Sequence, residues 1–284
     1  MAGRIFVHQQ ARGRKMRICL TFDVEEFTMP ADYGIRKHNN ETRFSKEGCI
    51  RLLEVLKKHK IMSTFFITGY FAEREREIVR MISEHGHEIA SHSYSDRNLS
   101  GLRRQKLEKS VYDSKKILEK ISKQEIRGFR SPHFSMNKHL FGVLEQSGFS
   151  YDSSVHPAIV PGHYWNINKG LDPYHAGENK KILEIPVSVI PGLRFPISWL
   201  WMRNFGNWIS VAGTKANIMK RDVVLYFHPW EFADIPKIKG LPFYITSNTG
   251  SDFLKSIDKF IIKNKRHGFG RMDEIMDKGG SDRR

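Results

Sequence analysis

Short apolar runs alternate along the chain with longer segments in which apolar residues recur at helical spacing. The apolar or β-branched runs occupy residues 17–23, 62–68, 88–93, 126–132, 151–154, 182–188 and 222–229. Helical spacing covers residues 46–60, 72–85, 103–122, 137–147 and 250–265. No tandem repeat or low-complexity linker interrupts this order, which predicts an α/β protein.

Two local signals add detail to these helices. Four apolar residues fall on one face of the third helical segment, as expected for a helix packed on a core: Leu107, Val111, Leu118 and Ile121. Ser251 stands at the start of the last segment, where its hydroxyl oxygen can accept a free backbone N–H. We therefore predict Ser251 as the N-cap of that helix.

Polar residues that could take part in catalysis or metal binding recur at one position in this pattern. They stand at or just beyond the C-terminal ends of apolar runs: Asp23, His92, Arg130, Asp152 and His228. In a parallel barrel these ends share one face, and that face carries the active site. The runs predict a barrel of seven or eight strands, closed or incomplete. An open doubly wound sheet is the alternative, but no glycine-rich phosphate loop follows the first run.

Length and composition set the domain organisation. A chain of 284 residues with 39% hydrophobic content suffices for one large domain or two small ones. We expect a disordered basic extension at 1–15, a single barrel domain at 16–275 and a polar tail at 276–284. Cys19 and Cys49 are too few for a disulfide framework and are predicted to be free thiols. No signal-peptide core or membrane-spanning run is present, so we expect a cytoplasmic protein without a transmembrane segment.

The charge balance restricts the partners. Lys plus Arg number 47 against 31 Asp plus Glu, a net charge of +16. Such an excess favours anionic partners, including phosphorylated sugars and the headgroups of an anionic lipid surface. A basic surface that only confers solubility is the alternative. No zinc-finger or RNA-recognition signature accompanies the charge, so nucleic-acid binding is not expected.

Six short motifs, in this order, resemble one known family. They read "LTFDVEEF", "SHSYSD", "FRSP", "YDSS", "EIPVS" and "LYFHPWEF" and extend over roughly residues 17–275. They are similar to the polysaccharide deacetylases, also called the NodB-homology or carbohydrate esterase family 4 proteins. The nearest branch has first and last motifs of Asp-Val-Glu-Asp and His-Pro-Trp-Glu. The resemblance implies a distorted (β/α) barrel and the metal-dependent removal of an N-acetyl group from a sugar.

The same resemblance implies catalytic roles that amide hydrolysis requires. Asp23 matches the base, Arg130 the residue that orients it in a bidentate ion pair, and His228 the acid. Asp152 matches a residue that tunes the acid through a hydrogen bond, and the backbone N–H of His133 matches the oxyanion donor. The alternatives without a catalytic role are a turn cap for Asp23, a surface ion pair for Arg130 and a core histidine for His228.

Aromatic residues near these motifs are candidates for substrate binding. Trp230 in the last motif and Trp199 could each stack on a sugar ring. Packing in the core is the equally simple alternative for both side chains.

The metal ligands depart from the usual family pattern. Val24 replaces the second of two adjacent aspartates, and Glu25 offers the next carboxylate on the same side of an extended chain as Asp23. His92 keeps its position, whereas Asp96 replaces the second histidine, at the spacing of one helical turn. Glu25, His92 and Asp96 are therefore the predicted ligands of a divalent metal.

The identity of that metal and the role of Asp96 stay open. A shell with two carboxylates favours Mn, Fe, Co or Mg relative to Zn. In the alternative, Asp96 caps a helix or pairs with Arg97 or Arg104, and no metal binds.

Three functions are compatible with these residues. The leading one is an intracellular deacetylase acting on an N-acetylated sugar carried by a nucleotide, a lipid or an oligosaccharide. The alternatives are a metal-independent amidohydrolase acting on a small cyclic amide and a non-catalytic carbohydrate-binding barrel. Asp23 and His228 argue against the last, because sugar binding alone requires neither a base nor an acid.

Overall fold

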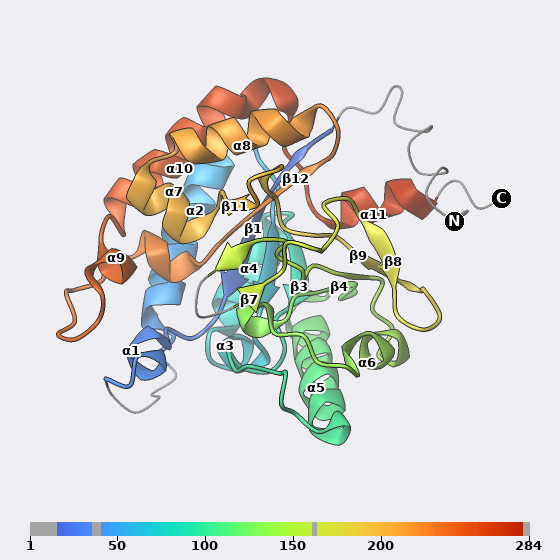
Figure 1. Cartoon of the computed structure of the whole chain (residues 1–284). Helices are drawn as coiled ribbons and strands as arrows, with labels where there is room; N and C mark the ends of the chain where they lie inside the picture. Colours follow the sequence, from blue (N-terminus) through green and yellow to red (C-terminus); the bar gives the residue numbers. More distant parts are fainter. Residues whose placement is uncertain (1–15, 36–40, 161–163, 281–284) are drawn as a thin grey trace.

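A curled sheet of eight strands forms the centre of the molecule (Figure 1). The computed structural model describes residues 16–35, 41–160 and 164–280. The sheet has the order β12-β1-β2-β3-β4-β5-β9-β8, in which only β8 and β9 pair antiparallel. The strands are β1 (Ile18–Val24), β2 (Thr64–Ile67), β3 (Glu88–Ser91), β4 (Gly128–Phe129), β5 (Tyr151–Asp152), β8 (Tyr174–Ala176), β9 (Ile182–Glu184) and β12 (Val223–Phe227).

The prediction of a distorted barrel with seven to eight strands is confirmed. Each of the seven predicted runs contains one strand of this sheet, and the seven strands are neighbours. The eighth strand, β8, is added at one edge. Curling of the sheet produces a half-barrel, and two hairpins lie outside it: β6 (Ile159–Val160) with β7 (Tyr164–Trp165), and β10 (Val189–Ile190) with β11 (Phe195–Pro196).

Helices cover the outside of the sheet, with α7, α8 and α10 along one side and α5 and α6 along another (Figure 1). The α-helices are α1 (Met29–Asp32), α2 (Arg43–His59), α3 (Gly69–Arg74), α4 (Arg76–Glu84), α5 (Arg104–Ser122), α6 (Leu140–Gln146), α7 (Trp199–Phe205), α8 (Trp208–Ile218), α9 (Phe243–Thr246), α10 (Ser251–Asn264) and α11 (Asp273–Gly280). Three short 3-10 helices are η1 (Pro132–Phe134), η2 (Pro229–Phe232) and η3 (Lys265–His267).

Two of the predicted helix details are wrong. The segment predicted as one helix over 72–85 is divided into α3 and α4 at Glu75, whose φ of −115° and ψ of 48° are not helical. The N-cap of α10 is Gly250 rather than Ser251, which is already the first helical residue. The predicted apolar face of α5 is confirmed, since all four of its residues are buried in the main core.

Alternation along β1 decides what the inside of the half-barrel contains. Ile18, Leu20, Phe22 and Val24 belong to the large apolar core, which they share with the covering helices. The intervening side chains, such as that of Asp23, must point to the opposite, inner face of the strand. The inner face therefore receives the polar residues at the C-terminal strand ends.

The N-terminal ends of the strands are closed by the start of α11. The backbone N–H of Met272 donates to Thr64 Oγ1, and the N–H of Asp273 donates to Glu88 Oε2. Met272 and Ile275 pack with inner-face residues such as Cys19. The expected domain end at 275 falls inside α11, and the segments 1–15 and 281–284 lie outside the described residues.

The cysteines are as expected, since Cys19 and Cys49 are both buried free thiols. Among the described residues, no helix combines the length and apolar character needed to cross a membrane.

Candidate active site

Asp23 and Arg130 form a buried ion pair at the C-terminal end of the sheet. Arg130 Nη1 donates to Asp23 Oδ1 at 2.7 Å and to Thr21 Oγ1 at 2.8 Å. The other guanidinium nitrogens donate to Ser153, through Nε to its carbonyl at 3.1 Å and Nη2 to its hydroxyl at 3.0 Å. The predicted bidentate pair is wrong, because half of the guanidinium fork holds Ser153 on the neighbouring segment. Arg130 is thereby fixed, and it holds only one oxygen of Asp23.

His92 is oriented so that one ring nitrogen faces the centre of the site. Its Nδ1 lies 2.8 Å from the backbone carbonyl of Arg130, and a carbonyl can only accept, so Nδ1 carries the proton. The unprotonated Nε2 then lies 3.4 Å from Glu25 Oε2. Such a backbone bond is the usual way in which a protein orients a metal-binding histidine.

Asp96 lies where the sequence places it, but for a different structural reason. Residues 92–96 form an irregular loop after β3 and not a helical turn, with Ser93 at a φ of 62°. Asp96 Oδ2 accepts the hydroxyl of Thr28 at 2.9 Å, and Oδ1 lies 3.2 Å from His133 Nε2. In the described part of the chain Asp96 makes no ion pair with an arginine.

Glu25, His92 and Asp96 form a group that can hold a metal ion. All three are buried, and one potential ligand atom from each lies within 4.8 Å of the others. Burial, followed by the charges of Asp96 and Asp23, raises the pKa of Glu25 well above its ordinary value. A divalent cation would balance these carboxylates, and the oxygen and nitrogen donors suit such an ion. The residues therefore fit the metal that the sequence predicts.

A further carboxylate, Glu26, points elsewhere. Its Oε2 accepts the hydroxyl of Thr68 at 2.8 Å, and burial raises its pKa to about 7. It lies outside the ligand group, as expected for the residue that follows Glu25 on an extended chain.

His228 stands at the end of β12, on the other side of Glu25. Its Nε2 lies 3.6 Å from Glu25 Oε1, and its Nδ1 lies 3.3 Å from Glu231 Oε1. The ring stacks on Trp230 at a centroid distance of 5.2 Å and meets Trp199 nearly at right angles at 5.0 Å. The predicted convergence is thus observed: short contacts connect Asp23 through Arg130, His92 and Glu25 to His228.

The predicted link between Asp152 and His228 is absent from the described contacts. Asp152 Oδ1 instead accepts the hydroxyl of Ser154 at 2.6 Å. Its carboxyl group also lies beside that of Glu184 on the adjacent strand, and burial raises the pKa of both groups. Since Ser154 Oγ accepts the N–H of Ser131, Asp152 supports the loop after β4 rather than the histidine.

The two predicted aromatic contacts have different environments. Trp230 is completely buried, so its ring offers no free face to a sugar, and its Nε1 donates to Glu25 Oε1 at 3.4 Å. Trp199 is only partly buried, at a positive φ of 47°. Its indole N–H has no hydrogen-bond partner among the described residues.

His133 has the backbone geometry expected of a residue that presents its amide. It adopts a φ of 55° inside η1, a conformation in which a non-glycine residue is strained. Within the described ranges its N–H makes no hydrogen bond. Its side chain is held by Asp96, which belongs to the ligand group.

Sequence reasoning missed three residues that complete these contacts. Thr28 holds Asp96, while Glu231 and Arg203 stand behind His228 as an ion pair of 3.1 Å. The final glutamate of "HPWE" was the available signal for Glu231. Arg203 lies 25 residues before the histidine in an apolar helix, where no local pattern reveals its partner.

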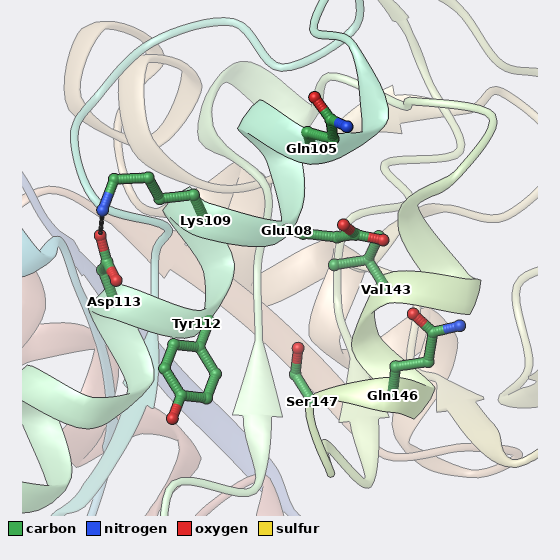
Figure 2. Close-up of a pocket in the computed structure, with 8 residues that line it drawn as sticks. All are labelled: Gln105, Glu108, Lys109, Tyr112, Asp113, Val143, Gln146 and Ser147. Atoms are coloured by element: carbon green, nitrogen blue, oxygen red, sulfur yellow. Dashed lines mark hydrogen bonds and ion pairs between the residues drawn. The ribbon is translucent and has the colours of Figure 1, made fainter.

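A separate polar groove of about 440 Å³ lies on the outside, between α5 and α6 (Figure 2). The Lys109–Asp113 ion pair of 2.7 Å lies on one of its walls. None of its lining residues belongs to the candidate active site, which lies inside the half-barrel.

The half-barrel places a carboxylate and a histidine at the ends of the neighbouring strands β1 and β12, with the ligand group beside them. This arrangement suits a hydrolase of the barrel-fold class that acts on amide bonds. The chain belongs to the polysaccharide deacetylase family, whose model matches residues 10–151. A second model, a domain of unknown function called DUF3473, matches residues 153–277. The predicted membership of the polysaccharide deacetylase family is therefore confirmed. His228, Glu231 and Arg203 all lie in the second range.

Similar proteins agree with this assignment. A peptidoglycan deacetylase of Helicobacter pylori is 24% identical over 73% of this chain and 84% of its own length. A peptidoglycan-N-acetylglucosamine deacetylase of Bacillus cereus is 30% identical over 35% of this chain and 46% of its own. Among solved structures, a Mycobacterium smegmatis protein provisionally described as a polysaccharide deacetylase is 22% identical and superposes with a TM-score of 0.69. That superposition covers 94% of this chain and 90% of the other, and it shows the shared fold.

Proposed function

We propose that this protein removes an N-acetyl group from a sugar or glycan by metal-assisted attack of water. The observation that carries the proposal is the position of the ligand group. Glu25, His92 and Asp96 lie together, Asp23 is two residues before Glu25, and His228 faces Glu25 from the other side. A base and an acid beside one metal site are the groups that hydrolysis of an amide requires.

Glu25, His92 and Asp96 are the residues that would hold the cation. When bound, a divalent cation supplies Lewis acidity, which polarises an acetyl carbonyl and makes water a better nucleophile. Two carboxylates and one histidine are a hard ligand set, and this supports Mn, Fe or Co as well as Zn.

Asp23 acts as the general base. Its Oδ1 is held by Arg130 at 2.7 Å, whereas Oδ2 makes no hydrogen bond among the described residues and can receive a proton from water. Because Arg130 is buried and fixed by Ser153, it keeps the carboxylate at one place while the proton moves.

His228 acts as the general acid for the leaving amine. Its Nε2 is the ring nitrogen on the side of Glu25, and stacking on Trp230 fixes the plane of the ring. The unpaired N–H of His133 donates to the oxyanion. Trp199 is only partly buried whereas Trp230 is completely buried, so Trp199 replaces Trp230 as the aromatic contact with the sugar.

We infer that the substrate is an N-acetylated sugar joined to a nucleotide, lipid or oligosaccharide carrier. The activities named for the similar Helicobacter and Bacillus proteins support the acetyl-sugar class. The net charge of +16 supports a carrier with phosphate groups.

Acetate release tests this proposal. The metal-loaded protein is incubated with N-acetylglucosamine oligomers, an N-acetylated sugar nucleotide and a lipid-linked N-acetyl sugar, with allantoin as a cyclic amide. The proposal expects acetate from at least one acetylated sugar and no turnover of the cyclic amide. Binding of sugars without acetate release would favour a non-catalytic barrel.

A further inference from the structure

A buried charged pair lies behind the ring of His228, on the side away from the ligand group. Glu231 is on η2, three residues after the histidine, and Arg203 is on α7. Arg203 Nε lies 3.1 Å from Glu231 Oε2, and neither side chain is accessible to solvent. A fully buried ion pair requires an explanation, since desolvation of two charges is unfavourable unless their geometry is good.

Glu231 is tied to His228 by two contacts of one oxygen. Oε1 accepts the backbone N–H of His228 at 2.9 Å and lies 3.3 Å from the ring Nδ1. A carboxylate oxygen can only accept here, so the contact selects the form of the ring in which Nδ1 carries a proton. This arrangement leaves Nε2 on the side of Glu25, where the substrate must bind.

Arg203 places its positive charge beside the other oxygen of Glu231, in an ion pair without hydrogen-bond geometry, and is itself held by backbone groups. Its Nη1 donates to the carbonyls of Ile245 and Ser247, both at 2.8 Å, next to α9. An arginine keeps its positive charge inside proteins, so a fixed cation stands next to the glutamate. The pair therefore connects α7 and α9 to the histidine at the end of β12.

We propose that Glu231 is a positioning residue for His228 and that Arg203 positions Glu231. This inference rests on the proposed function of His228 as the acid. It assigns to the 153–277 segment the acid together with the two residues that orient it. It also replaces Asp152, whose carboxyl group accepts the hydroxyl of Ser154 and makes no described contact with the histidine.

The proton balance of the step is simple. As the C–N bond of the tetrahedral intermediate breaks, the proton on His228 Nε2 moves to the leaving nitrogen. The Nδ1 proton stays on the ring, and Glu231 stabilises the charged ring without becoming protonated, as in other carboxylate–histidine pairs. Glu231 touches neither the substrate nor the reacting atoms.

Two acetyl substrates separate positioning from a general structural role. An N-acetyl sugar has an amine leaving group that needs a proton, whereas 4-nitrophenyl acetate releases a phenolate that does not. We expect Glu231→Gln to lower kcat for the sugar by about 10- to 100-fold with little change in KM. The kcat for the ester should stay within about threefold of wild type. Equal losses on both substrates would show a structural role and overturn the proposal.

His228→Ala keeps the failure of this inference separate from that of the proposed function. If His228 is the acid, this variant shows the same selective loss, and Glu231→Gln adds nothing to it in the double variant. No selective loss in His228→Ala would remove the acid role itself. If His228→Ala lowers kcat for the sugar but not for the ester, and Glu231→Gln does not, only the role of Glu231 is overturned.

A second variant and a measurement without turnover cover the case in which Glu231→Gln fails to fold. The pair Glu231→Met with Arg203→Met removes both charges together, so no unpaired charge stays buried. Nitrogen-15 NMR of the metal-free protein at one pH then reports the His228 ring. We expect a protonated Nδ1 in the wild type and its loss in the paired variant. A protonated His228 Nδ1 in both the wild type and the paired variant would contradict the proposal.

Discussion

Replacement of Asp96 tests the metal site at the residue where the chain departs most from its family. Asp96→Ala removes one of three ligands and leaves Glu25 and His92 in place. We expect metal affinity to fall about 100-fold, or about 2.8 kcal/mol of binding free energy. The apo protein should lose little stability. The hydroxyl of Thr28 keeps its bond to Asp32 at 2.8 Å, and a charge that acts against Glu25 disappears.

Thermal unfolding with and without metal measures this effect. At a metal concentration 100 times the wild-type Kd, binding stabilises the folded wild type by about 2.7 kcal/mol. At the same concentration, a 100-fold weaker variant gains only about 0.4 kcal/mol. At roughly 2 to 4 °C per kcal/mol, the metal-induced rise in Tm should decrease from several degrees to about one.

Glu26→Gln is the matched control, because Glu26 is a buried neighbouring carboxylate that bonds Thr68 instead of facing the ligand group. It should keep the full metal-induced rise in Tm. Asp96→His should restore binding and shift the preference towards zinc, since imidazole is a softer ligand than carboxylate. Equal metal responses in wild type and Asp96→Ala would refute the ligand role.

Three further predictions concern the acid–base pair, its support and the core. Asp23→Asn and His228→Ala should each lower kcat by roughly 10² to 10⁴ in folded protein, measured by acetate release. Arg130→Lys should lower kcat while metal content stays constant by elemental analysis, because lysine cannot hold Ser153 and Asp23 together. Burial lowers the pKa of His87 to about 4, and its Nδ1 accepts the N–H of Ser63, so protonation favours the unfolded chain. The neutral His87 ring therefore contributes its full share to the free energy of unfolding above about pH 6.5. That contribution is lost as the pH falls towards 4, and the loss reaches about 2 kcal/mol at pH 5. His87→Asn should remove that loss in denaturant titrations at pH 7.5 and 5, and identical pH profiles would contradict it.

The sheet and the catalytic strand ends could be predicted because they depend on local pattern. A buried parallel strand requires a continuous apolar run, and five of the seven runs placed a candidate site residue at the C-terminal end. The same periodicity could not show the break at Glu75, which depends on how α3 and α4 pack. Nor did it reveal α7 and α8, which were not predicted, because a mostly apolar segment such as 197–218 has no clear polar face.

The sequence predicted which residues belong to the site better than it predicted which of them contact one another. Spacing alone placed Asp96 near His92, although a loop, not a helix, brings them together. Burial of Trp230 and the partner of His228 depend on residues far away in sequence, such as Arg203 on α7. Long-range pairing of this kind leaves no periodic trace in a single sequence, and the bonds of Asp152 were missed for the same reason.

Acetate release measured against metal content tests the central claim most directly. Wild-type protein is stripped of metal, reloaded with Mn²⁺, Co²⁺ or Zn²⁺, and assayed on N-acetylated sugars beside Asp23→Asn at the same metal content. We predict that acetate release follows metal occupancy in the wild type and falls by roughly 10² to 10⁴ in Asp23→Asn. Equal release by both proteins, or no release by fully loaded wild type from any acetylated sugar, would contradict the account.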